Sequence, residues 1–235
     1  MKILLSKSIK NPIIVSGFPG LGFVASIALE FLIEHLKVEQ VGRIVLEEAP
    51  AMIAVHNGKK IDPFGIFYNK NYNIIVMHAV TPVQGLEWKI AGLITNLAEK
   101  TQAKEIISVE GVAGTNSGES KSFYYSNIDK NHEKFEKFGI EELKEGIIMG
   151  VAGALLINCD KLPITFIFSE THSSLPDSKA AAKIIEGLDK YLGLKIDYAP
   201  LLKQAENFEQ KLQNLMKKSI EATDLSEKKR LSYVG

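Results

Sequence analysis

The sequence predicts an α/β fold of three layers, with a mainly parallel central sheet that carries an antiparallel portion. Short β-branched runs alternate with helix-like segments over most of the chain, which is the pattern of parallel βαβ units. Between 51 and 79 the runs are short and turn residues separate them, which indicates an antiparallel meander. After residue 200 the pattern is purely helical. We therefore expect an α/β domain over 1–197 and a helical extension with a tail over 198–235.

The first predicted strand covers 13–16 and is followed by the glycine-rich turn G-F-P-G-L-G at 17–22. Apolar residues then recur at steps of three and four from 23 to 36, the spacing of one helix face. A strand at 41–46 precedes the meander, whose expected runs are 52–55, 61–67 and 73–78. Beyond the meander, the pattern predicts a helix, a strand, a flexible loop, a strand and a helix, at 85–100, 105–110, 111–122, 164–169 and 177–192.

Composition and charge argue against several kinds of partner. Lys and Arg number 28, as do Asp and Glu, so the formal charge is zero and favours neither nucleic acid nor an anionic membrane. The single cysteine, Cys159, cannot form an internal disulfide, which fits a reducing compartment. The longest apolar run covers 11 residues, 147–157, whereas a membrane span needs about 18. We expect a cytoplasmic protein without a secretory signal.

The turn at 17–22 raises the possibility of nucleotide binding. Gly20, Gly22 and Ala25 satisfy the pattern G-x-G-x-x-A between a strand and a helix, and Glu47 or Glu48 could contact a ribose. However, several residues including a proline separate the strand from the first motif glycine, and the acidic residue falls later than the usual spacing. The alternative is that the glycines permit a sharp turn and close packing.

Other chemical motifs are weak. The sequence has no phosphate loop of the G-x-x-x-x-G-K-[ST] type and no G-x-S-x-G nucleophile elbow, and its five histidines fall singly. Glu110, Glu170 and His172 follow predicted strands, where α/β proteins bind ligands. The latter two could equally belong to a capping network with Asp177, at the start of the last helix. We therefore expect no catalytic residues, no cofactor and no metal.

The C-terminal segment is a candidate for contacts between proteins. Leucine, alanine and phenylalanine recur at coiled-coil-like spacing at Leu201, Ala205, Phe208, Leu212 and Leu215. This seam could pack on its own domain or join subunits. A charged stretch, 223–230, precedes the end of the chain, where apolar residues are unusual. The candidate partner-binding residues are Leu231, Tyr233, Val234 and Gly235.

Five segments, taken in order, resemble the proteasome assembly chaperone 2 family in its archaeal branch. They are I-I-V-S-G-F-P-G-L-G-F-V-A-S at 13–26, E-G-V-A-G-T at 110–115, G-I-I-M-G-V-A-G-A-L-L at 146–156, E-T-H-S-S-L-P-D-S-K-A-A-A-K-I-I-E at 170–186 and P-L-L-K-Q-A-E at 200–206. The resemblance implies a nucleoside-phosphorylase-like α/β domain that serves as a non-enzymatic, homo-oligomeric scaffold. Its implied partners are the α-subunits of the proteasome core particle.

Some members of that family dock through a C-terminal hydrophobic–tyrosine–any tripeptide. In this chain Tyr233 is third from the end and Ser232 precedes it, so the terminal carboxylate moves by about 3.5 Å relative to the ring. Relatives have also been described as ATP-grasp-like. The alternative function is therefore a nucleotide- or dinucleotide-binding enzyme, ATP-grasp-like or phosphorylase-like, that uses the turn from Gly17 to Gly22. A third possibility is a structural oligomer with an unrelated partner.

Overall fold

The computed structural model describes residues 2–48, 53–56, 58–114, 120–159, 161–172, 175–200 and 202–203. The chain divides into two compact units, residues 1–197 and 198–235. All the elements named below belong to the first unit. No helix in the described part of the chain is long and apolar enough to cross a membrane.

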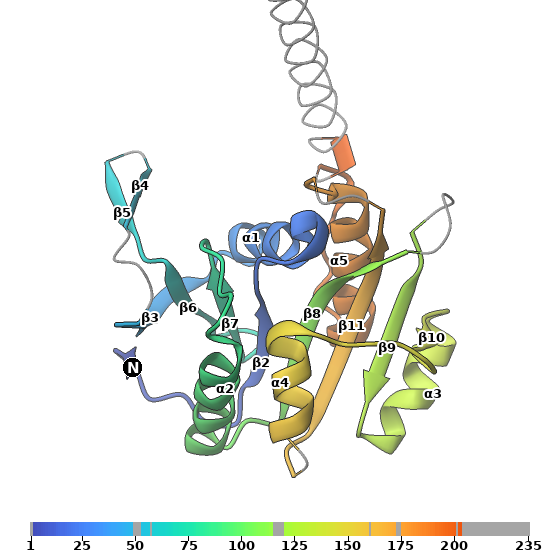
Figure 1. Ribbon diagram of the computed structural model, residues 1–235, viewed down its shortest axis with the longest axis horizontal. Helices are drawn as coiled ribbons and strands as arrows, with labels where there is room; N and C mark the ends of the chain where they lie inside the picture. The colour runs from blue at the N-terminus through green and yellow to red at the C-terminus, as the bar shows by residue number, and fades with distance from the viewer. Residues whose placement is uncertain are drawn as a thin grey trace, which may run out of the picture. The chain divides into compact units, whose positions relative to one another are not determined.

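Nine of the described strands form one sheet in the order β1-β3-β6-β7-β2-β8-β11-β9-β10 (Figure 1). Their bounds are β1 (Lys2–Leu5), β2 (Ile13–Gly17), β3 (Glu39–Val45), β6 (Phe64–Asn69), β7 (Ile74–Ala79), β8 (Glu105–Ala113), β9 (Ser122–Ser126), β10 (Glu141–Glu142) and β11 (Ile164–Thr171). Two further strands, β4 (Ala54–His56) and β5 (Lys59–Ile61), pair only with each other as an antiparallel hairpin.

The centre of the sheet is parallel and its flanks are mostly antiparallel. Strands β7, β2, β8 and β11 run parallel to one another. On one side, β1, β3, β6 and β7 pair antiparallel, and on the other β9 runs antiparallel to β11. The parallel strands are almost wholly buried, as expected when helices cover both faces of a sheet. The predicted α/β sheet, with its antiparallel portion, is confirmed.

Helices cover both faces of the sheet, which gives the three predicted layers (Figure 1). On one face α1 (Val24–His35) packs against α5 (Ser178–Leu192). On the other face α2 (Glu87–Thr101) packs against α4 (Gly150–Asn158), over a core that includes Ile14, Ile106 and Phe166. The short helix α3 (Asp129–Lys137) lies beside β9 and β10 at the end of the sheet.

The topology brings four strand ends to one edge. Because β7, β2, β8 and β11 are parallel, their carboxyl ends lie at the same edge. The chain leaves β2 through α1 toward β3, whereas it leaves β8 toward β9 and β11 on the opposite side. Such a reversal between adjacent strands is the place where open α/β sheets bind ligands.

Three local expectations need correction. The predicted strand 61–67 is divided between β5 and β6, because Pro63 has no N–H for a ladder hydrogen bond. The predicted loop from 111 begins three residues too early, because β8 stays paired with β11 as far as Ala113. Between 123 and 146 the sequence pattern predicts no element, yet the structure has most of β9, α3 and β10 there.

Candidate functional site

The sequence-predicted strand ends and the glycine turn meet at the C-terminal edge of the sheet. A Cβ atom added at Gly20 would lie 3.7 Å from the Oε2 atom of Glu110 on β8. Gly22 has a positive φ of 61°, and a Cβ there would lie 2.7 Å from the hydroxyl of Thr171 at the end of β11. The turn therefore lies directly over the ends of β8 and β11.

Asp177 connects this turn to β11 and α5. Its backbone N–H donates to the carbonyl of Gly22 at 2.9 Å, and its Oδ2 atom accepts from the hydroxyl of Thr171 at 2.8 Å. Its Oδ1 atom accepts from the N–H of Ala180 at 2.9 Å, the hydrogen bond of a helix N-cap. The capping interpretation is confirmed for Asp177.

Replacing Asp177 by alanine is expected to lower the free energy of unfolding by about 1–3 kcal/mol, because both the cap and the hydrogen bond from Thr171 are lost. Urea denaturation of the full chain measures the loss. Asp177→Asn is the matched control, since asparagine is an equally good cap and should recover most of the stability. A loss below about 0.5 kcal/mol in the alanine variant would contradict this role.

The glycine turn shows the features of close packing. A Cβ at Gly17 would come within 2.9 Å of both the Ala25 Cβ of α1 and the Val109 Cγ2 of β8. Glu48, one of the two candidate ribose ligands, instead forms an ion pair with Lys89 of α2 at 3.0 Å. These contacts support the interpretation that glycine permits close packing of α1 on the sheet.

Glu110 has an unusual environment for a carboxyl group. It is half-buried and forms no hydrogen bond or ion pair with any described residue, and burial raises its pKa to about 8. Ser108 lies two residues earlier on the same face of β8 and pairs in register with Ser16 of β2. Both serine hydroxyls are buried without a hydrogen-bond partner among the described residues. Three polar side chains without a hydrogen-bond partner among the described residues therefore lie close together on β2 and β8, between which the strand order reverses.

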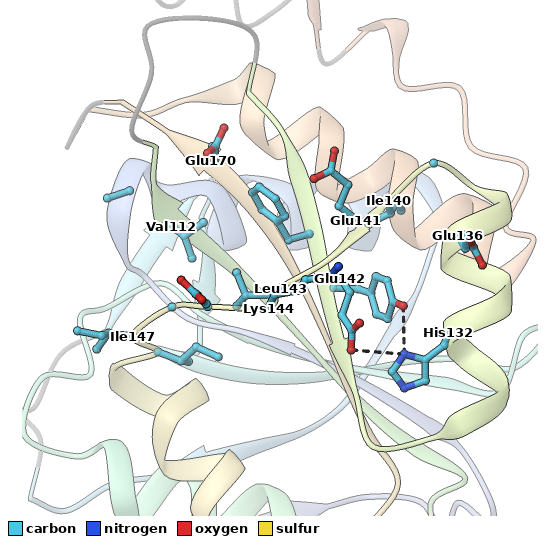
Figure 2. A pocket seen from close by; sticks show the side chains of 17 residues that line it. Val112, His132, Glu136, Ile140, Glu141, Glu142, Leu143, Lys144, Ile147 and Glu170 are labelled. Atoms are coloured by element: carbon cyan, nitrogen blue, oxygen red, sulfur yellow. Dashed lines mark hydrogen bonds and ion pairs between the residues drawn. The ribbon is translucent and has the colours of Figure 1, made fainter.

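A cavity of about 1090 Å³ opens beside this edge (Figure 2). The ends of β8 and β11, the strands β9 and β10, and the segment 143–148 form its walls. Its apolar lining includes Val112, Phe123, Leu143, Ile147 and Ile148. Its carboxylates belong to Glu136, Glu141, Glu142, Glu145 and Glu170, and its basic side chains to His132 and Lys144.

Some polar groups of the cavity bond to their neighbours. The Tyr124 hydroxyl lies 3.1 Å from Nδ1 of His132, and the Glu142 carboxylate lies 3.6 Å from the same nitrogen (Figure 2). Burial and the charges of Glu142 and Glu136 raise the pKa of the Tyr124 phenol. The phenol therefore remains protonated at neutral pH. The described residues contain no group of three or more side chains suited to a metal ion.

Not all the sequence-predicted site residues can be placed. Glu170 lines the cavity, where its Oε2 atom accepts from the N–H of Lys121 at 3.2 Å. The imidazole of His172 packs closely against Gly114. The tail residues Leu231, Tyr233, Val234 and Gly235 lie outside the described residues, as do the five seam residues Leu201, Ala205, Phe208, Leu212 and Leu215. Residues 132–148, which form one wall of the cavity, were not predicted from the sequence to belong to a site. Their glutamates followed by I-I-M could have indicated an acidic surface next to an apolar one.

The fold and the site define a three-layer α/β protein with an acidic cleft at the C-terminal edge of its sheet. The chain belongs to the PAC2 family, whose model matches residues 14–216, and to the archaeal branch of that family.

Individual relatives match nearly the whole chain. The solved structure of Pyrococcus furiosus PbaA, an archaeal homolog of proteasome-assembly chaperone, is 29% identical, covers 97% of each chain and has a TM-score of 0.81. The protein MJ0106 of Methanocaldococcus jannaschii is 26% identical over 228 residues, which is 96% of this chain and 94% of the relative. Pyrococcus furiosus PbaB, an archaeal proteasome activator, shares the fold, with 22% identity, a TM-score of 0.77, and coverage of 92% of this chain and 98% of PbaB.

Proposed function

We propose that this protein is a non-enzymatic, protein-binding scaffold, a proteasome assembly chaperone or proteasome-binding adaptor that acts as a homo-oligomer. Its proposed partners are the α-subunits of the core particle. The observation that carries the proposal is the similarity to PbaA over 97% of both chains. The site is consistent with it, since no serine, threonine or cysteine is among the described residues that line the cavity.

Exposed apolar side chains supply a physical basis for protein binding. Trp88 at the start of α2 is 58% exposed, and Met149, which precedes α4, is 78% exposed. Ile157 near the end of α4 is 64% exposed. All three lie on or next to α2 and α4, which pack together on one face of the sheet (Figure 1). We assign it to contacts between subunits or with the partner.

The tail is proposed as a second contact. Leu231, Tyr233, Val234 and Gly235 would bury an aromatic ring and offer the terminal carboxylate to a basic pocket, a small contact that oligomer avidity multiplies. A pull-down against archaeal α-subunits and assembled core particle compares the full chain with a truncation ending at Arg230. A variant with 231–235 replaced by glycine and serine controls for tail length. Binding that both variants retain would overturn the role of the tail and place the contact on the folded domain.

Small-molecule binding near the turn is the second candidate function. One observation favours it: Glu110, Ser16 and Ser108 leave hydrogen-bonding capacity unused at the point of chain reversal. A thermal-shift screen with nucleotides, amines and amides tests this candidate. A rise in Tm that depends on ligand concentration would support it.

A further inference from the structure

The cleft of Figure 2 is strongly acidic although the whole chain is neutral. Five glutamates against one lysine leave a local charge of −4 with His132 neutral, while the formal charge of the chain is zero. Glu136, Glu141 and Glu145 are exposed and form no ion pair within the described part of the chain. Like charges held together without partners repel one another, and a cation would relieve this repulsion.

The floor and the lip of the cleft are apolar. Val112, Phe123, Leu143 and Ile148 are partly buried and pack against the hydrophobic core. At the lip the side chain of Ile147 is 88% exposed, and Met149 beyond it is 78% exposed. In Figure 2 Ile147 and Val112 lie on the same side of the cleft. A ligand that suits both features must combine positive charge with aliphatic side chains.

From these two features we propose that the cleft docks a segment of a partner protein that combines basic with aliphatic residues. Its basic side chains face Glu141, Glu145 and Glu170, and its aliphatic side chains pack on Val112 and Ile148. The inference rests on the proposed scaffold function and specifies the chemistry of the partner.

Fluorescence anisotropy with the full chain tests the proposal. The probe is a fluorescein-labelled peptide that alternates lysine with leucine or isoleucine, compared with peptides in which glutamate replaces lysine or serine replaces the aliphatic residues. The first peptide is expected to bind at least about tenfold more tightly than either of the others, and raising the salt concentration should weaken it. Equal binding of the three peptides would overturn the proposal.

Matched charge reversals locate the site. Glu141→Lys with Glu145→Lys alters two exposed carboxylates of the cleft, and Glu34→Lys with Glu99→Lys alters two exposed carboxylates on α1 and α2. The net change in charge is identical, so only the cleft variant should bind the basic peptide about tenfold more weakly. Equal weakening in both variants would overturn the site. A cleft variant that changes the oligomeric state but not peptide binding would instead assign the cleft to contacts between copies.

This test is separate from the test of the proposed function. Peptide binding requires no proteasome component, so the cleft can fail while the full chain still binds the core particle. The scaffold proposal fails on its own if the basic peptide binds the cleft and neither α-subunits nor the core particle are captured.

Discussion

Replacing Glu105 by alanine is expected to lower the free energy of unfolding by about 3–5 kcal/mol, because it removes the acceptor from a buried polar network. Glu105 begins β8 and is 7% exposed. Its Oε1 atom accepts from the hydroxyl of Thr165 at 2.5 Å and from the Asn131 amide at 3.2 Å, and its Oε2 atom accepts from the hydroxyl of Tyr191 at 2.8 Å. Without the carboxyl group, these donors from β11, α3 and α5 have lost their shared acceptor.

Urea denaturation measures this loss, and Tyr191→Phe is its graded control. The phenylalanine ring keeps the stack on Phe135, whose centroid lies 4.8 Å away, and gives up only the hydroxyl. Its cost should therefore be about 1–2 kcal/mol. If Glu105→Ala stays within about 1 kcal/mol of the native chain, the network does not join these elements as described.

Glu110→Gln is expected to have the opposite effect and to stabilise the protein at neutral and alkaline pH. Burial raises the pKa of Glu110 from 4.5 to about 8 in the folded protein. A difference of one pKa unit corresponds to about 1.36 kcal/mol. Burial of the Glu110 carboxyl group therefore lowers the free energy of unfolding by at most about 3 kcal/mol at pH 7. Because part of the side chain reaches solvent, the measured gain should be smaller, about 2 kcal/mol.

The pH dependence separates this effect from a simple packing change. The pKa of Glu110 is higher in the folded protein than in the unfolded chain. Its burial therefore costs no stability below pH 4.5, where it is protonated in both states, and the free energy of unfolding falls as the pH rises to about 8. The difference in Tm between Glu110→Gln and the native chain should thus be near zero at pH 4.5 and reach several degrees at pH 8. Glu99→Gln, at an exposed glutamate of α2, is the control. A difference that is constant with pH would contradict the assignment.

A buried carboxyl group that lowers stability at neutral pH marks a candidate functional position. Groups that reduce stability are commonly kept where a protein functions, and Glu110 lies at the point of chain reversal beside Gly20. A ligand or a partner group that donates a hydrogen bond to Glu110 would recover the stability that burial costs.

Local signals explain why part of the molecule could be predicted from the sequence. The β-branched run before Gly17 and the helical spacing after it predict β2 and α1, because strand and helix periodicities are short-range properties. Asp177 just after a proline predicts the start of α5 by the capping preference alone. The gathering of Glu110 and Glu170 at one edge follows from the predicted parallel order.

The contacts and elements that could not be predicted from the sequence depend on pairing between distant residues. Glu105 and Tyr191 are 86 residues apart, and neither has a local pattern that predicts their hydrogen bond. The strand β10 covers only two residues, and it is a strand because β9 lies beside it. Since β9 and β10 are short and α3 has only nine mainly polar residues, none of them gives a long apolar pattern, and the cleft that they enclose could not be derived from spacing.

Direct titration of the full chain against an immobilised archaeal core particle and against separate α-subunits tests the scaffold proposal most directly. Biolayer interferometry would give the affinity, and a parallel titration with β-subunits would measure specificity. We predict saturable binding to the core particle or the α-subunits, in the range of about 10⁻⁷–10⁻⁵ M, and none to β-subunits alone. Absence of saturable binding to both α-containing forms, with correctly folded protein, would contradict the proposed role.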